Sequence, residues 1–146
     1  MKSKKIILGC AIGNCVHIGG LNHFLRLAEL EGYKTYSLGP AVPLERLFNE
    51  IEKYSPDIVA ISYRLTPEVA ENLFDELKKR IDEKSLHNIK FIFGGTPSVA
   101  EVARKKNIFE KIFDGTESID EVKSYLKGIH KKNIHEIYPQ TLLERI

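Results

Sequence analysis

The sequence predicts a doubly wound α/β fold around a five-stranded parallel sheet, and three observations support this prediction. Short apolar runs alternate with segments of helical hydrophobic period, and this pair occurs five times along the 146 residues. The connections are short, and parallel neighbours need crossover connections, which are right-handed. The third apolar run, "DIVAIS", has no polar alternation after its first residue, as expected for a strand covered on both faces.

The first two units follow from apolar spacing and from the residues that end helices. A strand over Lys4–Leu8 precedes a helix that begins at Leu21 and that Gly32 stops, in which apolar residues recur at positions i, i+3, i+4 and i+7. A second strand over Lys34–Gly39 precedes a helix that opens on Pro43 and ends before Pro56. Both units therefore have the strand and helix order of a crossover connection.

The remaining three units repeat this order. A strand over Asp57–Ser62 precedes the longest helix, over Thr66–Lys84, in which Thr66 suits the N-cap before Pro67. The last two units are, in chain order, a strand over Ile89–Gly95, a helix over Ser98–Lys106, a strand over Phe109–Gly115 and a helix over Ser118–His130.

Composition excludes several classes of protein. Lys and Arg number 22 against 20 Asp and Glu, with the signs interleaved, so we expect no nucleic-acid partner and no membrane partner. No segment approaches the roughly 20 apolar residues of a membrane span, and we expect a cytoplasmic protein.

The length suits one domain, which we expect over residues 1–130. Residues 131–146 are expected to form a C-terminal tail, or a linker to a missing domain or partner.

The connection between the first strand and its helix, "GCAIGNCVHIGG", is longer than the usual 2–6 residues. A long loop at the carboxyl edge of such a sheet indicates function. Its glycine spacing does not fit a dinucleotide fingerprint, and it lacks the lysine of a P-loop. A zinc site of Cys10, Cys15, His17 and His23 remains an alternative, as does a loop with a solvated histidine and a buried, inert cysteine.

The stretch "CVHIGG", residues 15–20, resembles the Asp-x-His-x-x-Gly signature of the cobalamin-binding domain family. This family includes methionine synthase, methyltransferase corrinoid proteins and the small subunits of carbon-skeleton mutases. The resemblance covers about residues 4–130 and implies the cobalamin-binding type of the Rossmann-like or flavodoxin-like fold. Further family elements are matched in order by Ser62 in "ISYRLTP", by Gly94 and Gly95 in "FIFGGTPS", and by Gly115 and Thr116 after the fifth strand.

The resemblance also implies residue roles. His17 would be the metal ligand, binding the cobalt of cobalamin, and no catalytic residue is expected in this domain. Cys15 stands at the position of the family aspartate, and Arg64 replaces the leucine of the family's Ser-x-Leu element. The cofactor-binding residues expected from the resemblance are Cys15, His17, Gly20, Ser62, Leu65, Thr66, Gly94, Gly95, Gly115 and Thr116.

Such a domain presents methylcobalamin or adenosylcobalamin to a catalytic partner domain or subunit that holds the substrate. The stretches "GPAVP" (Gly39–Pro43) and "LTP" (Leu65–Pro67) resemble methionine synthase and favour methyl transfer. The start of the chain at the first strand favours the alternative of a small subunit of an adenosylcobalamin-dependent mutase. A degenerate flavodoxin-like interaction module or a cobalamin-sensing module is a third possibility.

Overall fold

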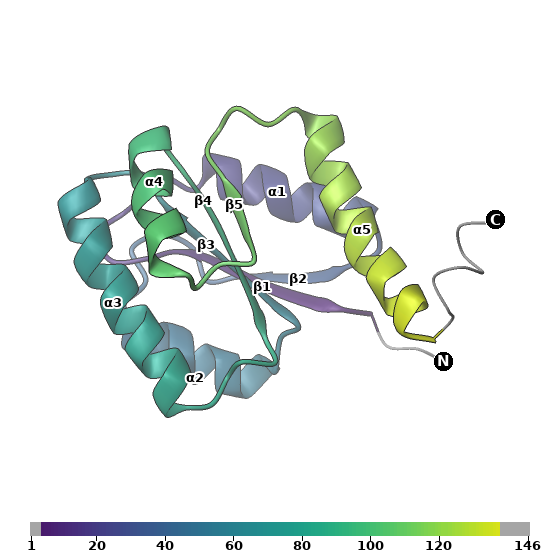
Figure 1. The fold of residues 1–146 in the computed structure, drawn as a ribbon, viewed down its shortest axis with the longest axis horizontal. Helices are drawn as coiled ribbons and strands as arrows, with labels where there is room; N and C mark the ends of the chain where they lie inside the picture. Colours follow the sequence, from purple (N-terminus) through teal and green to yellow (C-terminus); the bar gives the residue numbers. More distant parts are fainter. Residues whose placement is uncertain (1–3, 138–146) are drawn as a thin grey trace. The chain divides into compact units, whose positions relative to one another are not determined.

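The computed structural model describes residues 4–137, which form the five strand and helix pairs that the sequence predicts (Figure 1). The chain divides into two compact units, residues 1–116 and residues 117–146. The strands of the first unit are β1 (Ile6–Ala11), β2 (Lys34–Ser37), β3 (Ile58–Tyr63), β4 (Lys90–Gly95) and β5 (Lys111–Phe113). Its helices are α1 (Gly19–Leu30), α2 (Leu44–Tyr54), α3 (Pro67–Glu83) and α4 (Pro97–Lys106).

The five strands form one parallel sheet in the order β2-β1-β3-β4-β5. The predicted doubly wound fold is therefore confirmed. Because all strands run in the same direction, their carboxyl ends and the loops that follow them meet at one edge of the sheet. The point where the strand order reverses lies between β1 and β3, where such folds bind their ligands.

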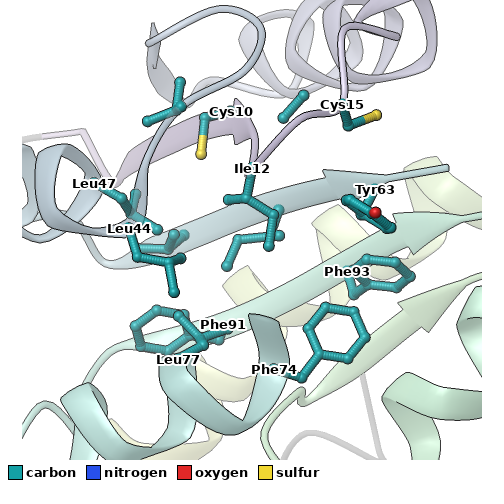
Figure 2. Close-up of a cluster of buried hydrophobic side chains, with 14 of the residues drawn as sticks. Cys10, Ile12, Cys15, Leu44, Leu47, Tyr63, Phe74, Leu77, Phe91 and Phe93 are labelled. Atoms are coloured by element: carbon teal, nitrogen blue, oxygen red, sulfur yellow. The ribbon is translucent and has the colours of Figure 1, made fainter. Parts of the chain in front are cut away.

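One face of the sheet carries the main hydrophobic core, to which α2, α3 and α4 contribute buried side chains (Figure 2). Phe74 of α3 meets Phe93 of β4 edge to face, with ring centroids 5.2 Å apart, and meets Phe109 at 5.3 Å in the same geometry. Edge-to-face aromatic pairs contribute about 0.5–1.5 kcal/mol each beyond the area that they bury. This face is therefore filled by large, interlocked side chains.

The opposite face is covered in part by α1, which lies close to β1. A Cβ added to Gly9 would come within 3.1 Å of Leu21 and 3.2 Å of Leu25, so the absence of a side chain lets the helix approach. Gly9 pairs with Ala60 of β3, another small residue. The α1 face of the sheet thus has small residues where the helix comes closest to β1.

The structure changes several of the expected boundaries. Strand β1 continues to Ala11 and α1 begins at Gly19, so the first loop is shorter at both ends than the sequence suggests. The helix of the second unit, α5 (Ile119–Ile137), continues past residue 130, where the sequence suggested that a tail begins. Residues 138–146, the rest of that expected tail, lie outside the described residues.

The expected N-cap of α3 is confirmed, since the side chain of Thr66 accepts a hydrogen bond from the backbone N–H of Val69 at 3.3 Å. Such a cap satisfies one of the free N–H groups in the first turn of a helix and contributes about 1 kcal/mol. No helix within residues 4–137 is long and apolar enough to cross a membrane.

Candidate functional site

The first loop, residues 12–18, leaves β1 at the carboxyl edge and has a fixed base and an exposed tip. At the base, the backbone N–H of Gly13 donates to the carbonyl of Val42 at 3.0 Å. The N–H of Ala41 donates to the carbonyl of Cys15 at 2.8 Å. Beyond Cys15, the side chains of Val16 and His17 are exposed. The loop therefore presents its histidine to solvent from a support that is hydrogen-bonded to the loop after β2.

Cys15 lies beneath His17. Its side chain is fully buried, and its sulfur lies 3.8 Å from Nδ1 of the His17 ring. Within the described part of the chain, no hydrogen bond involves the other ring nitrogen, Nε2. A neutral imidazole binds a metal through one nitrogen while the other is held by a neighbouring group. His17 is therefore arranged to offer Nε2, although a thiol is a weaker hydrogen-bonding partner than the family carboxylate.

The zinc alternative finds no support in this geometry. Among residues 4–137, no three His, Cys, Asp or Glu side chains lie where they could hold a metal ion together. Burial raises the pKa of Cys10 to about 12, against an opposing effect of Arg46, so this thiol stays protonated at neutral pH and is a poor ligand. In Figure 2 the Cys10 sulfur points into the hydrophobic cluster, and the Cys15 sulfur points away from Cys10.

Ser62 and Gly94 lie side by side on the α1 face of the sheet, near its carboxyl edge. Ser62 of β3 pairs with Gly94 of β4 on one side and with Ala11 of β1 on the other. Paired residues of parallel strands point to the same face, so these three small residues form a row. A Cβ added to Gly94 would meet no heavy atom within 4 Å, so there is open space above this part of the sheet.

The hydroxyl of Ser62 has no partner in this row. Ser62 is 7% exposed and is the one buried residue of polar type in the described part of the chain. Its side chain forms no hydrogen bond with any described residue. Buried polar groups are normally hydrogen-bonded, and each exception requires an explanation. A ligand in the space above Gly94 would supply the missing partner, and Ser62 and Gly94 are both among the cofactor-binding residues that the family resemblance implies.

An aromatic pair adjoins this space. Phe113 of β5 pairs with Gly94 and so lies on the same face of the sheet. Its ring lies 5.9 Å from the ring of Phe24 on α1, measured between centroids. The open row is thus bordered by apolar rings and contains one hydroxyl, a combination that suits a ligand with both apolar and polar parts.

At Gly95, close packing requires a glycine. It lies on the core face, where an added Cβ would come within 2.3 Å of the carbonyl oxygen of Tyr63 and 2.7 Å of the ring of Phe93. The structure therefore separates the expected glycine pair, because Gly94 faces open space and Gly95 faces packed atoms. A contact of Gly95 with a cofactor stays a prediction, while its lack of a side chain is already required by packing.

The other expected site residues lie in loops at the same edge or at the start of α1. Gly115 has a φ of +94°, which favours glycine. It follows Asp114, whose Oδ1 accepts two hydrogen bonds from Thr116, one from the backbone N–H at 3.0 Å and one from the hydroxyl at 2.6 Å. Leu65 packs against the core, and Gly20, in the first turn of α1, is exposed with open space at its Cβ position. The hydroxyls of Thr66 and Thr116 are already hydrogen-bonded within the protein.

Two contacts near this edge were not expected from the sequence. One is the Phe24–Phe113 pair, and the other is a hydrogen bond from the hydroxyl of Tyr63 to Oδ1 of Asn14 at 3.2 Å. A tyrosine at the end of an otherwise apolar strand is a weak signal, because its hydroxyl needs a partner when it is buried. The sequence does not indicate which residue supplies that partner.

These features define a class: a doubly wound domain with a ligand site at the carboxyl edge of its sheet and a histidine on an extended first loop. The model of the B12-binding domain family matches residues 5–123 of this chain. The chain therefore belongs to the B12-binding domain family, whose ligand is cobalamin. A search of curated proteins found no match.

Solved structures agree with this family. A cobalamin-binding protein from Desulfitobacterium hafniense is similar over 85% of this chain and 58% of its own, with 25% identity and a TM-score of 0.68. The methanol:cobalamin methyltransferase complex MtaBC from Methanosarcina barkeri contains a chain that is similar over 86% of this one and 52% of its own, with 20% identity and a TM-score of 0.68. This chain therefore spans little more than half the length of either.

The same fold also occurs in response regulators. The isolated receiver domain of RcsB from Salmonella enterica is similar over 88% of this chain and 90% of its own, with 10% identity and a TM-score of 0.58. At this identity, and at the 20% of the MtaBC chain, the likeness shows the fold alone. The assignment to the B12-binding family thus depends on the family model, and the fold by itself does not separate it from receiver domains.

Proposed function

We propose that this chain binds cobalamin at the carboxyl edge of its sheet and presents it to a catalytic partner domain or subunit for methyl transfer. The observation that carries the proposal is the unpaired, buried hydroxyl of Ser62 beside the open space at Gly94. An unsatisfied buried polar group costs about 1–3 kcal/mol. A ligand that hydrogen-bonds Ser62 removes this cost, so the same feature that destabilises the free chain favours the complex.

His17 has the role of metal ligand in this proposal, since its Nε2 has no partner within the described residues and its side chain is exposed. When the cofactor is bound, its cobalt carries the transferred group, and the protein binds and orients the cofactor. Cys15 contacts the imidazole from below. The remaining cofactor-binding residues in the proposal are Gly20, Ser62, Leu65, Thr66, Gly94, Gly95, Gly115 and Thr116.

The choice of methyl transfer depends on the resemblance of Gly39–Pro43 and Leu65–Pro67 to methionine synthase. A chain of the same fold occurs in a methanol:cobalamin methyltransferase complex, which is compatible with this choice. We further propose that the cofactor-binding domain covers residues 1–130 and that residues 131–146 lead toward a partner. The substrate would then be held by that partner.

Reconstitution with hydroxocobalamin tests the binding proposal. We expect the 146-residue chain to retain a visible absorption band after desalting, at one cobalamin per chain. In His17→Ala the band should shift, because the imidazole that would bind cobalt is removed. His23→Ala is the matched control, since His23 is exposed on α1 and has no role in the proposal. A chain that retains no colour would overturn the assignment of function.

The form of the cofactor is tested by comparing the affinity for methylcobalamin with that for adenosylcobalamin. A methyl carrier should bind methylcobalamin at least as tightly as adenosylcobalamin. A preference of about tenfold or more for adenosylcobalamin would contradict the methyl-transfer proposal and favour a mutase subunit.

A further inference from the structure

The position of His17 depends on how the first loop is held, and Asn14 lies in the fixed base of the loop, between the hydrogen-bonded residues Gly13 and Cys15. The backbone of this loop is bonded to its neighbours at Gly13 and at Cys15, and the N–H of Cys15 also donates to the carbonyl of Ile12 at 3.2 Å. Val16 and His17 have no backbone bond of this kind among the contacts within residues 4–137. The tip is therefore oriented by whatever fixes Asn14 and Cys15.

Asn14 is tied to the sheet through a side chain of the core. Tyr63, the last residue of β3, is fully buried, and its hydroxyl donates a hydrogen bond to Oδ1 of Asn14 at 3.2 Å. It is the one hydrogen bond that this hydroxyl makes within residues 4–137. Of the two side chains, only Tyr63 depends on this hydrogen bond. Asn14 is exposed and can hydrogen-bond to water instead, whereas the buried hydroxyl of Tyr63 would stay unpaired if it lost its acceptor.

Tyr63 is itself held firmly. It pairs with Gly95 of β4, and its carbonyl oxygen lies 2.3 Å from the position that a Cβ of Gly95 would occupy. Figure 2 shows Tyr63 among the buried side chains of the core, next to Phe93. Because cores are packed at nearly crystalline density, the Tyr63 hydroxyl is a rigid point against which a loop can be fixed.

We propose that Tyr63 and Asn14 are positioning residues for His17, and that their hydrogen bond fixes the loop before a cofactor arrives. His17 lies three residues after Asn14, so freedom at Asn14 becomes freedom of the imidazole. A loop that is already ordered loses less entropy when its histidine binds a metal. The role of His17 toward cobalt is taken from the function proposed above. The hydrogen bond between Tyr63 and Asn14, which we call the anchor, is a property of the free chain.

Hydrogen exchange in the cofactor-free chain tests the anchor directly. Tyr63→Phe removes the oxygen and little else, and we expect two hydrogen-bonded amides to exchange about tenfold faster: that of Cys15, and that of Ala41, which donates to the Cys15 carbonyl. Asn14→Ala should have the same effect from the exposed side, and it should also lower the free energy of unfolding, because it leaves the buried Tyr63 hydroxyl without an acceptor. Asn14→Asp keeps an acceptor oxygen and should restore slow exchange. Tyr33→Phe, at another buried tyrosine, should leave the loop unchanged.

Binding of hydroxocobalamin tests the positioning role. In Tyr63→Phe and Asn14→Ala we expect about five- to tenfold weaker binding and a smaller spectral difference from His17→Ala. Unchanged exchange in both variants would overturn the anchor. Faster exchange with unchanged affinity and spectrum would overturn the positioning role. If the unaltered chain retains no cobalamin, the function proposed above fails, and the exchange data alone then decide whether the anchor exists.

Discussion

Two adjacent residues of β4 meet opposite surroundings at the carboxyl end of the sheet. A Cβ added to Gly95 would overlap the backbone of Tyr63, whereas one added to Gly94 would meet no heavy atom within 4 Å. On the Gly95 face, Tyr63 and Phe93 are fully or almost fully buried in an interlocked aromatic core. On the Gly94 face, the neighbouring residue is Ser62, buried without a hydrogen bond. We call these the packed face and the open face.

The comparison teaches how one sheet can serve two purposes. Side chains alternate between the faces of a strand, so each strand contributes in turn to stability and to a binding surface. The packed face stabilises the fold and holds the first loop through Tyr63. The open face leaves space and one unsatisfied hydroxyl, features that lower the stability of the free chain. Substitutions on the two faces should therefore separate stability from ligand binding.

Gly95→Ala tests the packed face and should have the largest effect. The added Cβ would lie 2.3 Å from a backbone oxygen, which a side-chain rotation cannot relieve. Overpacking of this kind costs about 3 kcal/mol or more, so we expect a large loss in the free energy of unfolding by urea denaturation. A variant as stable as the original chain would show that the packed face has room that the structure does not indicate.

Gly94→Val tests the open face and should act on binding alone. Apart from its two chain neighbours, no described residue has a heavy atom within 4 Å of the new Cβ, so the free energy of unfolding should change by less than about 1 kcal/mol. A branched side chain would occupy the space that we assign to the ligand. We expect binding of hydroxocobalamin to weaken by about 100-fold, equivalent to about 2.7 kcal/mol. Unchanged affinity would place the ligand elsewhere.

Sequence analysis could not separate these two glycines. The five units were predictable because hydrophobic period and helix-ending residues are local signals, and the loop histidine was predictable from a motif. Which face each glycine meets depends on strand register and on atoms distant in sequence, such as the Tyr63 carbonyl. The start of α1 at Gly19 was also missed, since consecutive glycines have low helix propensity.

The hydrogen-bond partner of Tyr63 could not be predicted from the sequence, for a related reason. Asn14 and Tyr63 are 49 positions apart, and the hydrogen bond between them depends on the path of the first loop over the end of β3. Turn and helix signals operate over a few residues, so they predict that a loop exists and not what holds it. The sequence thus predicted a long loop that carries His17, but not the contacts that hold this loop.

The packed face should also make the fold sensitive to alkali. Burial raises the pKa of Cys10 from its usual value of 9.0 to about 12, so the folded chain keeps a proton that the unfolded chain releases between these values. Stability should therefore fall as pH rises above 9, by up to about 1.4 kcal/mol per pH unit from this group. The pKa of Tyr33 is also raised to about 12 by burial and adds to the loss above pH 10.

Urea unfolding at pH 8, 9 and 10 measures this slope. Cys10→Ala removes the thiol and should flatten the slope between pH 9 and pH 10, where Tyr33 contributes little. The variant will be less stable at neutral pH because it leaves a small cavity, but that loss does not depend on pH. An equal slope in both chains would contradict the assignment of alkaline sensitivity to the packed face.

Ser62→Ala should have the smallest effect, and its two parts should have opposite signs. Removing a buried hydroxyl that has no partner should leave the free energy of unfolding unchanged or raise it by about 1 kcal/mol. Binding of hydroxocobalamin should weaken about five- to tenfold, the contribution of one hydrogen bond. Ser37→Ala is the matched control, because Ser37 ends β2 at the same edge but is exposed and already accepts a hydrogen bond from the N–H of Gly39. A loss of stability together with unchanged binding would mean that Ser62 serves the fold, and the open face would then lose its one polar contact with the ligand.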